Sequence, residues 1–457
     1  MKKKRSLLKP LLIAASIPII VLGLKTAIDI RKGAAGIPAN IVIDAVNTHG
    51  SSPNTLWQNL GQGGEEMKDM IGPVAPLVRS LQPKLIRIDH LYDYYNVYNG
   101  PNNYDFTRLD QVINSILSTG AKPMLSLSYT PSSMAKDNKV ANIPNNWSDW
   151  NNLITATAHR YSVEKKIDGI YYEVWNEPDL FGGWLYSKDP NYLTLYQNTA
   201  RAVVAGAGSA NYKIGGPATT GFYGNWIKAL FQFCTTNHLP LNFISWHRYS
   251  KNMLDFDNDF NTLNGILSQY PQYFGVERLI TEVGPDSEPN AWYDSKVSGI
   301  HLLALVNTLV GKVHRIFPFE IVDGPLSVRN GSTGWGLITN PANGARPKPR
   351  FFALKFLNQI SGSQLGSLGN GSWVTALATK KDDGTIQVML VNYDPSGTHS
   401  ETFPLRIVGL TSGKYVLKRT DYLGSTSSQE ITIPSYLYQT PFYLEANSAT
   451  LLELTHQ

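Results

Sequence analysis

The chain has 457 residues, of which 42% are hydrophobic and 16% charged, so it can build a large core and is not generally disordered. Its formal net charge is +5, but four of the cations, Lys2, Lys3, Lys4 and Arg5, cluster at the amino terminus. The rest of the chain is nearly neutral, which argues against a dedicated nucleic-acid binder or a basic membrane-surface protein.

Residues 1–35 are predicted to be a targeting segment. The basic stretch KKKR precedes 14 apolar or small residues, Leu11 to Leu24, a length that suits a signal-peptide core better than a membrane span. Because no small-residue cleavage site is evident, a cleaved signal peptide and an uncleaved membrane anchor are both open. In either case we expect the rest of the chain to be secreted or anchored to the outer face of the cell membrane.

Eight short apolar runs follow, and helical stretches with apolar residues at three- and four-residue spacing separate them. Such runs, unlike alternating ones, are typical of parallel strands buried on both faces. The pattern predicts an α/β fold, a closed (β/α)8 TIM barrel over residues 36–368. An open doubly wound sheet is the alternative, but no glycine-rich phosphate loop follows the first run. The predicted strands are 40–46, 84–89, 122–128, 169–175, 212–217, 242–247, 278–283 and 314–319.

From about residue 370 the pattern changes. Apolar and polar residues alternate, and Gly or Asn turns recur about every ten positions. This pattern predicts antiparallel strands in a β-sandwich over residues 369–457.

Metal and cofactor sites are not predicted. Cys234 is the only cysteine, so there is neither an intramolecular disulfide nor a cysteine-based zinc site. The nine histidines show no HExxH or comparable ligand spacing.

Two carboxylates stand at the ends of predicted barrel strands. Glu177 follows the fourth run in YYEVWNEPDL, and Glu282 ends the seventh in LITEVGP. In a (β/α)8 barrel the carboxyl ends of the strands line the active site, so these side chains are expected to meet across the barrel mouth. One protonated and one ionised carboxyl group perform glycoside hydrolysis, with retention when they lie about 5–5.5 Å apart. A purely structural pair of carboxylates is the alternative.

These two segments and their surroundings resemble glycoside hydrolase family 39, which belongs to the retaining glycosidases of clan A. The family includes β-xylosidases, α-L-iduronidases and bacterial exopolysaccharide endoglycosidases. The resemblance covers nearly everything from residue 40 onward, and it extends to KPMLSLSYTPSSMA, NFISWHRYS, GWGLITNPANGARPKPRFFALKFL and VTALATKKDDGTIQVMLVNYD.

The resemblance implies that Glu177 is the general acid/base and Glu282 the nucleophile. Asn176 would hydrogen-bond the sugar 2-hydroxyl, a contact that strengthens as positive charge develops at the anomeric carbon. Arg87 would lie beside Glu282 and lower its pKa, because a nearby cation favours the ionised carboxylate. An ion pair between Arg87 and Asp89 is the alternative.

The sixth predicted strand would supply two further residues. His247 and Tyr249 would flank the nucleophile and a sugar hydroxyl, although His247 could instead be a hydrogen-bonded core histidine. Glu173, which lies within its strand, is predicted to be a structural carboxylate inside the barrel.

Two departures from the family pattern concern the sugar-binding residues. The xylosidases carry Arg-x-His on the second strand, where this chain has Arg87 and Asp89 with one residue between them. The eighth strand lacks the expected Trp, and Phe317, Phe319 and Trp335 are the candidates to replace it. Asp89 and Trp335 therefore join the predicted substrate-binding residues, and both departures weaken a xylosidase assignment.

The sequence thus predicts a retaining glycosidase that cleaves O-glycosidic bonds of a polysaccharide or oligosaccharide by double displacement. Endo action on an extracellular polysaccharide is favoured. The alternatives are an exo-β-xylosidase-like enzyme and a catalytically silent carbohydrate-binding or polysaccharide-assembly protein on the same scaffold. The expected partner is a carbohydrate substrate, with no nucleic acid, no cofactor and a membrane tether only through residues 1–35.

Overall fold

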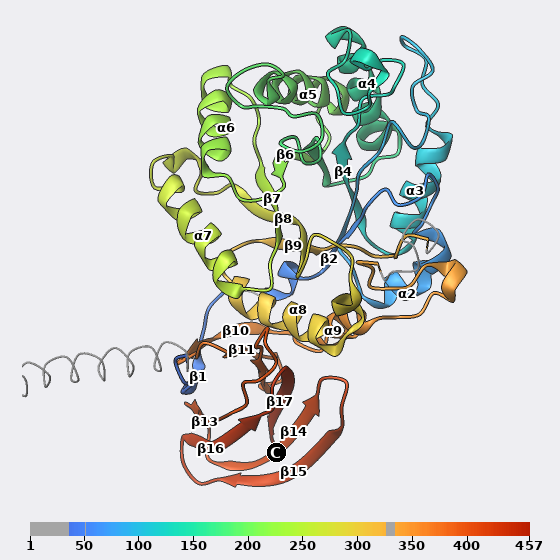
Figure 1. The fold of residues 1–457 in the computed structure, drawn as a ribbon. Coiled ribbons are helices and arrows are strands. Elements are labelled where there is room, and N and C mark those ends of the chain that lie inside the picture. Colours follow the sequence, from blue (N-terminus) through green and yellow to red (C-terminus); the bar gives the residue numbers. More distant parts are fainter. Residues whose placement is uncertain (1–35, 51, 326–333) are drawn as a thin grey trace, which may run out of the picture.

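The computed structural model describes residues 36–50, 52–325 and 334–457 (Figure 1). The predicted targeting segment, residues 1–35, lies outside these ranges. Among the helices that are described, none combines the length and apolar character needed to cross a membrane.

The larger unit is an eight-stranded parallel barrel. Its strands are β2 (Asn59–Gln62), β3 (Leu85–Ile88), β4 (Lys122–Leu127), β5 (Ile170–Val174), β6 (Tyr212–Thr219), β7 (Phe243–Tyr249), β8 (Glu277–Gly284) and β9 (Arg315–Pro318). Each strand pairs in parallel with the next along the chain. A parallel bridge between Gly61 and Phe319 joins the first strand to the end of the last, which closes the barrel.

Helices surround this barrel on its outside (Figure 1). They are α2 (Ala75–Ser80), α3 (Thr107–Ser118), α4 (Trp147–Ala158), α5 (Tyr192–Ala207), α6 (Gly224–Asn237), α7 (Met253–Leu267), α8 (Lys296–Leu309) and α9 (Pro349–Leu357). Short helical turns are Pro53–Leu56, Gly72–Val74, Lys136–Asn138, His159–Glu164, Pro271–Tyr273, Ala291–Asp294 and Pro341–Asn343. The side-chain oxygens of Asn146, Asn191 and Asn252 cap α4, α5 and α7 by accepting from backbone N–H groups.

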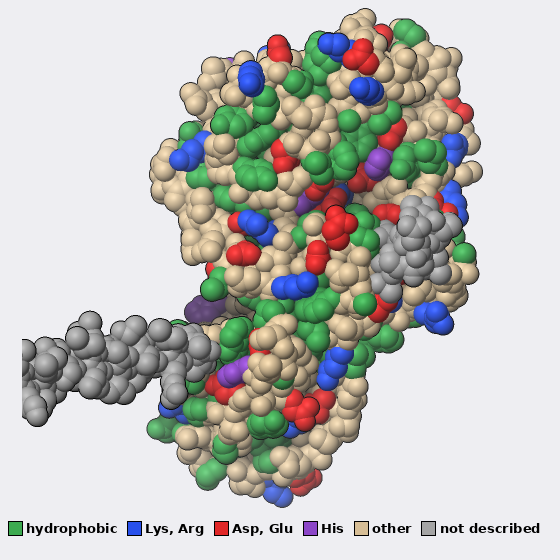
Figure 2. Space-filling view, viewed as in Figure 1, with side chains coloured by type: hydrophobic (Ala, Val, Ile, Leu, Met, Phe, Trp, Pro, Cys, Tyr) green, Lys and Arg blue, Asp and Glu red, His purple; other side chains and the backbone are tan. Residues whose placement is uncertain are grey.

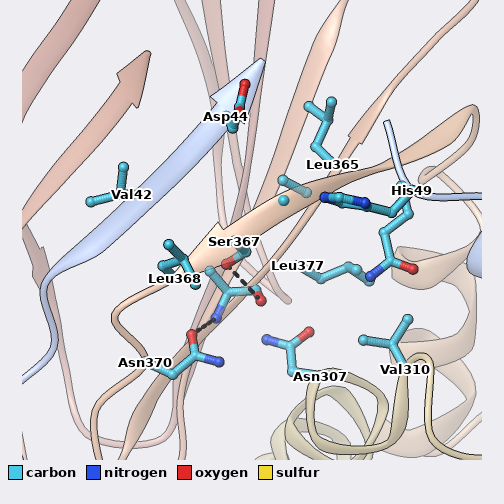
Figure 3. Close-up of a pocket in the computed structure, with 14 residues that line it drawn as sticks. Val42, Asp44, His49, Asn307, Val310, Leu365, Ser367, Leu368, Asn370 and Leu377 are labelled. Atoms are coloured by element: carbon cyan, nitrogen blue, oxygen red, sulfur yellow. Dashed lines mark hydrogen bonds between the residues drawn. The ribbon is translucent and has the colours of Figure 1, made fainter. Parts of the chain in front are cut away.

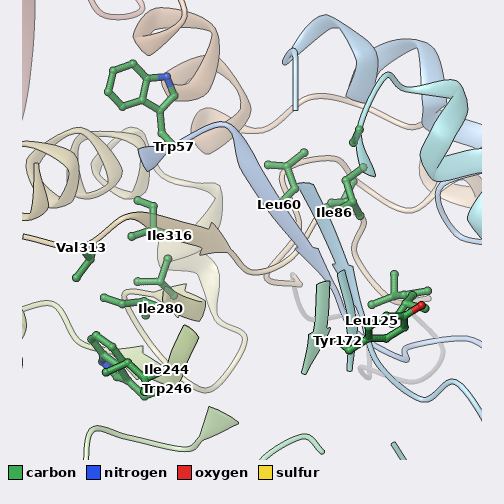
Figure 4. Close-up of a cluster of buried hydrophobic side chains, with 14 of the residues drawn as sticks. Trp57, Leu60, Ile86, Leu125, Tyr172, Ile244, Trp246, Ile280, Val313 and Ile316 are labelled. Atoms are coloured by element: carbon green, nitrogen blue, oxygen red, sulfur yellow. The ribbon is translucent and has the colours of Figure 1, made fainter. Parts of the chain in front are cut away.

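The strands are buried on both faces, as the continuous apolar runs predict. Tyr171 points into the barrel, where it belongs to a small cluster of interior side chains that includes Phe243 and Leu279. Its neighbour Tyr172 belongs instead to the larger cluster between the strands and the helices, together with Leu125 (Figure 4). Successive side chains of one strand point to opposite faces and therefore pack into two separate cores.

The first predicted barrel strand is wrong. Residues 40–46 belong to β1 (Ile41–Thr48), which lies in the other sheet, and the barrel begins with β2. In β1 the side chains of Ile41, Ile43 and Ala45 are buried while those between them are partly exposed, so only one face is covered. That period of two is typical of a sheet with one solvent-facing side. The other seven predicted strands correspond to β3 through β9.

The smaller unit is a mixed sheet of nine strands. It contains β1, β10 (Ser363–Leu368), β11 (Val374–Lys380), β12 (Ile386–Asn392), β13 (Glu401–Val408), β14 (Gly413–Asp421), β15 (Thr426–Ile433), β16 (Leu437–Leu444) and β17 (Ser448–His456). The spatial order is β15-β14-β17-β12-β11-β10-β1-β13-β16, and all pairs are antiparallel except β1 with β13. Strands from both ends of this order bury side chains in one core, for example Leu417 and Ile407, as the faces of a sandwich do.

The predicted fold class, a (β/α)8 barrel followed by a β-domain, is thereby confirmed. The assignment of residues differs at two places. Residues 41–48 and 363–368 were placed within the barrel domain, and both segments are strands of the nine-stranded sheet.

Helix α8 joins the two units. It is buried on almost all sides because it lies between the barrel strands and the sheet (Figure 1). Asn307 on this helix donates to the hydroxyl of Thr375 at 3.0 Å, and the hydroxyl of Tyr422 in the sheet unit donates to the carbonyl of Pro349 at 2.6 Å.

Tyr422 packs so closely against Gly299 of α8 that the effect of adding one methyl group at this glycine can be predicted. A Cβ at Gly299 on α8 would lie 2.0 Å from the Tyr422 hydroxyl, whereas one at Gly265, exposed on α7, would meet nothing within 4 Å. We expect Gly299→Ala to lower the free energy of unfolding by about 1–3 kcal/mol through overpacking. The matched control Gly265→Ala should raise it by up to about 1 kcal/mol, because it removes helix-interior glycine. Urea titration of both variants measures the difference, and equal stabilities would contradict the close packing.

Candidate active site

A cleft of about 670 Å³ opens at the carboxyl ends of the barrel strands. Figure 2 shows acidic side chains gathered in a hollow on this face of the barrel unit, with histidine beside them. The cleft lining includes Asp89, His90, Tyr129, Asn176, Glu177 and Glu282. The acidic residues therefore meet at the mouth of the barrel, where the sequence predicts the site.

Glu177 reaches the cleft through an unusual turn after β5. Both Trp175 (φ 72°) and Glu177 (φ 46°) have left-handed backbone conformations, which are uncommon for residues other than glycine and are concentrated at functional sites. The turn is fixed by the Glu177 N–H, which donates to the Ala218 carbonyl at 2.9 Å, and by the Ser126 hydroxyl, which donates to the Trp175 carbonyl at 2.8 Å.

Glu282 lies near the end of β8 and is only 6% exposed. Each of its oxygens has a different partner. Arg87 donates from Nη1 to Oε1 at 3.0 Å, and the Tyr249 hydroxyl donates to Oε2 at 2.8 Å. These donors fix the orientation of the carboxylate and occupy about half of its roughly four acceptor sites.

His247 connects the two carboxylates. Its Nδ1 lies 2.8 Å from Oε1 of Glu177 and 3.5 Å from Oε2 of Glu282. One oxygen of Glu177, one of Glu282 and one ring nitrogen of His247 all lie within 4.8 Å of one another. The predicted close approach of the carboxyl groups is confirmed, and such an approach agrees better with the spacing of retaining glycosidases than with the wider gap that admits a water molecule in inverting ones.

Arg87 is fully buried beneath the cleft and donates to three acceptors. They are Oε2 of Glu173 at 2.6 Å, Oε1 of Glu282 at 3.0 Å and the side-chain oxygen of Asn176 at 2.7 Å. Arg87 therefore does not form the alternative ion pair with Asp89. Glu173 is the buried structural carboxylate expected from its place in the strand.

Asn176 is held at both ends of its amide group. Arg87 donates to its oxygen, and its Nδ2 donates to the hydroxyl of Tyr129 at 2.9 Å. Tyr129 was missed in the sequence, although its position two residues after the end of β4 could have signalled it, because strand ends form the site. His90, which follows β3 in the same way, was also missed and lines the cleft.

Burial controls the electrostatics of Glu282. It raises the pKa of this carboxyl above its ordinary value, although the charges of His247 and Arg87 oppose the increase. Arg87 lowers this pKa, as predicted, but the loss of hydration outweighs its effect. For His247, burial alone would lower the pKa, but the negative charges of Glu282 and Glu177 raise it overall.

The remaining predicted residues lie in two layers. Asn176, Asp89, Tyr249 and Trp335 line the cleft itself. Arg87 and His247 lie behind the carboxylates and are fully buried, which suits them to position Glu177 and Glu282 rather than to contact a sugar directly.

Among the described residues, one group of side chains could hold a metal ion. Glu177, His247 and Glu282 are the three side chains close enough together to share an ion. The guanidinium of Arg87 already lies 3.0 Å from Glu282, and its positive charge would repel a divalent cation at this position. The arrangement suits proton transfer and nucleophilic attack better than metal binding.

A second cavity, of about 450 Å³, lies between α8 and the sheet unit (Figure 3). It is lined by apolar side chains such as Leu365 and Leu377, together with Asp44 and His49. Asp44 already accepts from the side chain of Asn47 and from nearby backbone N–H groups. This cavity therefore lacks the two converging carboxyl groups found in the barrel mouth.

Known proteins are similar to this chain in both sequence and fold. The family model for glycosyl hydrolases family 39 matches residues 80–264. A β-xylosidase of Geobacillus stearothermophilus is 26% identical over 325 residues, which is 63% of this chain and 62% of that relative. A β-xylosidase of Caldicellulosiruptor saccharolyticus is 32% identical over 162 residues, 33% of this chain and 32% of its own length. The matches thus span less than two thirds of these curated relatives.

Solved structures extend the likeness to nearly the whole chain. The family 39 enzyme of Xanthomonas axonopodis pv. citri superposes with a TM-score of 0.74 at 19% identity, covering 92% of this chain and 98% of that one. A monomeric β-xylosidase of Caulobacter crescentus CB15 gives 0.75 at 20% identity, covering 92% and 99%. In sequence and in fold the chain is therefore similar to glycoside hydrolase family 39. This similarity agrees with the resemblance seen in the sequence.

The geometry of Arg87 predicts how the site responds to loss of the guanidinium. Arg87→Lys keeps the charge but can reach only one of the three acceptors, which leaves buried polar groups unpaired. We expect the free energy of unfolding to fall by about 3–5 kcal/mol, as when a buried ion pair is broken. The matched control is Arg79→Lys, since Arg79 is exposed and donates only to the Ser118 carbonyl. It should change stability by less than about 0.5 kcal/mol. Urea unfolding compares the two, and a similar small effect in both would show that Arg87 is not needed to hold the site.

Proposed function

We propose that the protein is a retaining glycoside hydrolase that cleaves O-glycosidic bonds by double displacement. The observation that carries the proposal is the distance between Glu177 and Glu282, whose oxygens lie within 4.8 Å of each other in the barrel mouth. At that distance the second carboxylate can attack the sugar directly. The similarity to family 39 and the β-xylosidase names of the relatives give further support.

In the first step Glu282 is the nucleophile and Glu177 the acid. An electron pair on a Glu282 oxygen forms a bond to the anomeric carbon, while the bond from that carbon to the glycosidic oxygen breaks. Glu177 gives its proton to the departing oxygen, which leaves as an alcohol. The products are a glycosyl ester on Glu282 and an ionised Glu177.

In the second step Glu177 acts as a base. It takes a proton from a water molecule, whose oxygen attacks the anomeric carbon and displaces Glu282. Two inversions give a sugar of the original configuration, and both carboxyl groups return to their starting states.

The surrounding residues prepare both steps. Arg87 and Tyr249 hold separate oxygens of Glu282, and His247 contacts Glu177 at 2.8 Å. Because Arg87 and Tyr129 fix its amide, Asn176 is oriented without help from a ligand. Such orientation before the substrate arrives reduces the reorganisation needed in the transition state.

We favour endo action on an extracellular polysaccharide. Leu180 (61% exposed) and Phe181 (41% exposed) line the cleft just beyond Glu177 and offer an apolar surface on which further sugar rings could stack. Residues 1–35, read as a signal or anchor, support a location outside the cytoplasm or on the outer membrane face. An exo-β-xylosidase is the second candidate, favoured by the names of the curated relatives. Early release of long oligosaccharides from a polysaccharide, measured by gel permeation, would support endo action, and release of xylose alone would support the second candidate.

Azide rescue assigns the roles of the two carboxylates. Without its nucleophile, Glu282→Ala should lose at least about 10⁴-fold in kcat, and azide occupying the space should give a glycosyl azide of inverted configuration. With the matched variant Glu177→Ala, azide should attack the intermediate and give a glycosyl azide of retained configuration. NMR of the products from an aryl β-glycoside distinguishes the two. The same configuration from both variants, or full activity in either variant, would refute the proposed roles.

The acidic limb of the pH profile should report the coupled site in which Glu282 must be ionised. This group must be ionised to attack, so kcat/KM falls as pH drops below its pKa, which burial raises above the ordinary 4.5. The limb should therefore lie above pH 4.5. Tyr249→Phe removes a donor that favours the ionised form, so it should move the limb about 0.4–1 pH unit higher. The control Tyr443→Phe, at an exposed position in β16, should not move it. A limb that moves to lower pH in Tyr249→Phe would contradict the contact as the stabiliser of the carboxylate.

A further inference from the structure

Asp89 is a cleft residue whose carboxylate is incompletely satisfied by the protein. It follows β3 directly and lies two positions after Arg87, so both side chains are on the same side of the strand. Asp89 lines the cleft, yet it is only 6% exposed. Its Oδ1 is buried and accepts no hydrogen bond from any described residue. This is the position at which the chain departs from the Arg-x-His pattern of the family's xylosidases.

Such an arrangement is unfavourable for the folded protein. A buried carboxylate oxygen without a donor loses its hydration and gains nothing in return. Burial accordingly raises the pKa of Asp89, although the positive charges of His90 and Arg87 oppose the increase. Unsatisfied buried polar groups are rare in native proteins, and in a cleft they commonly await a ligand.

Two cations near Asp89 direct donors elsewhere. All three contacts of Arg87 go to Glu173, Glu282 and Asn176. Nδ1 of His90 lies 2.7 Å from a carboxylate oxygen of Asp93. A hydroxyl of a molecule bound in the cleft can therefore supply a donor that neither of these side chains gives to Asp89.

The chemistry of the cleft restricts that molecule. A sugar hydroxyl can donate to Asp89, whereas the carboxylate of a uronic acid can only accept and would be repelled. Glu65 and Glu288 add further negative charge to the lining. Arg248, the one arginine of the lining, is paired with the buried Asp259 at 2.7 Å, so its charge is already neutralised.

We propose that Asp89 is a specificity-determining residue that accepts a hydrogen bond from a hydroxyl of the sugar bound against Glu282. It thereby selects a neutral, hydroxyl-bearing sugar and rejects one that carries a carboxylate at that place. This inference rests on the proposed glycosidase function and deepens it by naming the class of sugar.

Deoxy substrates test the contact. The probes are 4-nitrophenyl β-glycosides of xylose, glucose and galactose, their 3-, 4- and 6-deoxy analogues where these exist, and the β-glucuronide. In the wild type, removal of the hydroxyl that faces Asp89 should lower kcat/KM about 10–100-fold. In Asp89→Asn, which keeps the size but not the charge, that penalty should shrink to below about 3-fold. The preference for glucoside over glucuronide should fall about 10-fold or more.

A matched substitution and a stability measurement exclude a merely structural role. Asp382→Asn changes an exposed aspartate in the turn between β11 and β12, far from the cleft, and should leave every ratio unchanged. Asp89→Asn should leave the thermal midpoint unchanged or raise it, because a buried charge is removed. A lower midpoint together with unchanged deoxy penalties would overturn the proposal.

Binding separates failure of this inference from failure of the glycosidase function. Titration calorimetry with Glu282→Gln and the same glycosides needs no turnover. Weaker binding of one deoxy glycoside, abolished when Asp89→Asn is added, supports the contact even if the wild type hydrolyses none of the probes. Lack of hydrolysis of both these probes and polysaccharides would count against the proposed function alone. Hydrolysis by the wild type with identical deoxy penalties in Asp89→Asn would overturn only the role of Asp89.

Discussion

The site depends on one buried cation. Arg87 has no access to solvent, so its charge has to be balanced inside the barrel, and its planar guanidinium fixes the directions from which acceptors can approach. Its acceptors come from β5, the turn after β5, and β8, so one side chain on β3 aligns the strand ends that carry Glu177 and Glu282. Glu173, on β5, accepts from the same guanidinium at 2.6 Å and so shares the positive charge of Arg87 with Glu282.

The close approach of two carboxyl groups is electrostatically unfavourable, and neighbouring cations partly offset it. Burial and the charge of Glu177 both raise the pKa of Glu282, while His247 and Arg87 lower it. Because Nδ1 of His247 lies near both carboxylates, the charge of each group acts on its neighbours, and a pH profile reflects the site rather than one residue. The same burial that raises the pKa keeps water from competing for the nucleophile.

The sequence predicts where strands end better than it predicts which side chains hydrogen-bond to one another. Glu177 could be placed because an apolar run followed by Asn-Glu-Pro indicates a strand that stops at the barrel mouth, and Glu282 because it ends the apolar run in LITEVGP. The first strand was misplaced, because Ile41, Ile43 and Ala45 make an apolar run in which only alternate residues are buried, while Asn59–Gln62 has too few apolar residues to be recognised. The partners of Arg87 and the net pKa shift of Glu282 depend on three-dimensional burial, which local sequence does not encode.

The nine-stranded sheet reaches the site through α9. The Tyr422 hydroxyl of the sheet unit donates to the carbonyl of Pro349, the first residue of that helix, at 2.6 Å. The next residue, Arg350, is buried and donates to the carbonyls of Phe319 at 2.7 Å and Val283 at 3.2 Å. Val283 follows Glu282 directly, and Phe319 lines the cleft. The sheet is therefore attached to the backbone that carries Glu282, so the position of this carboxylate depends on residues from both units of the chain rather than on the barrel alone.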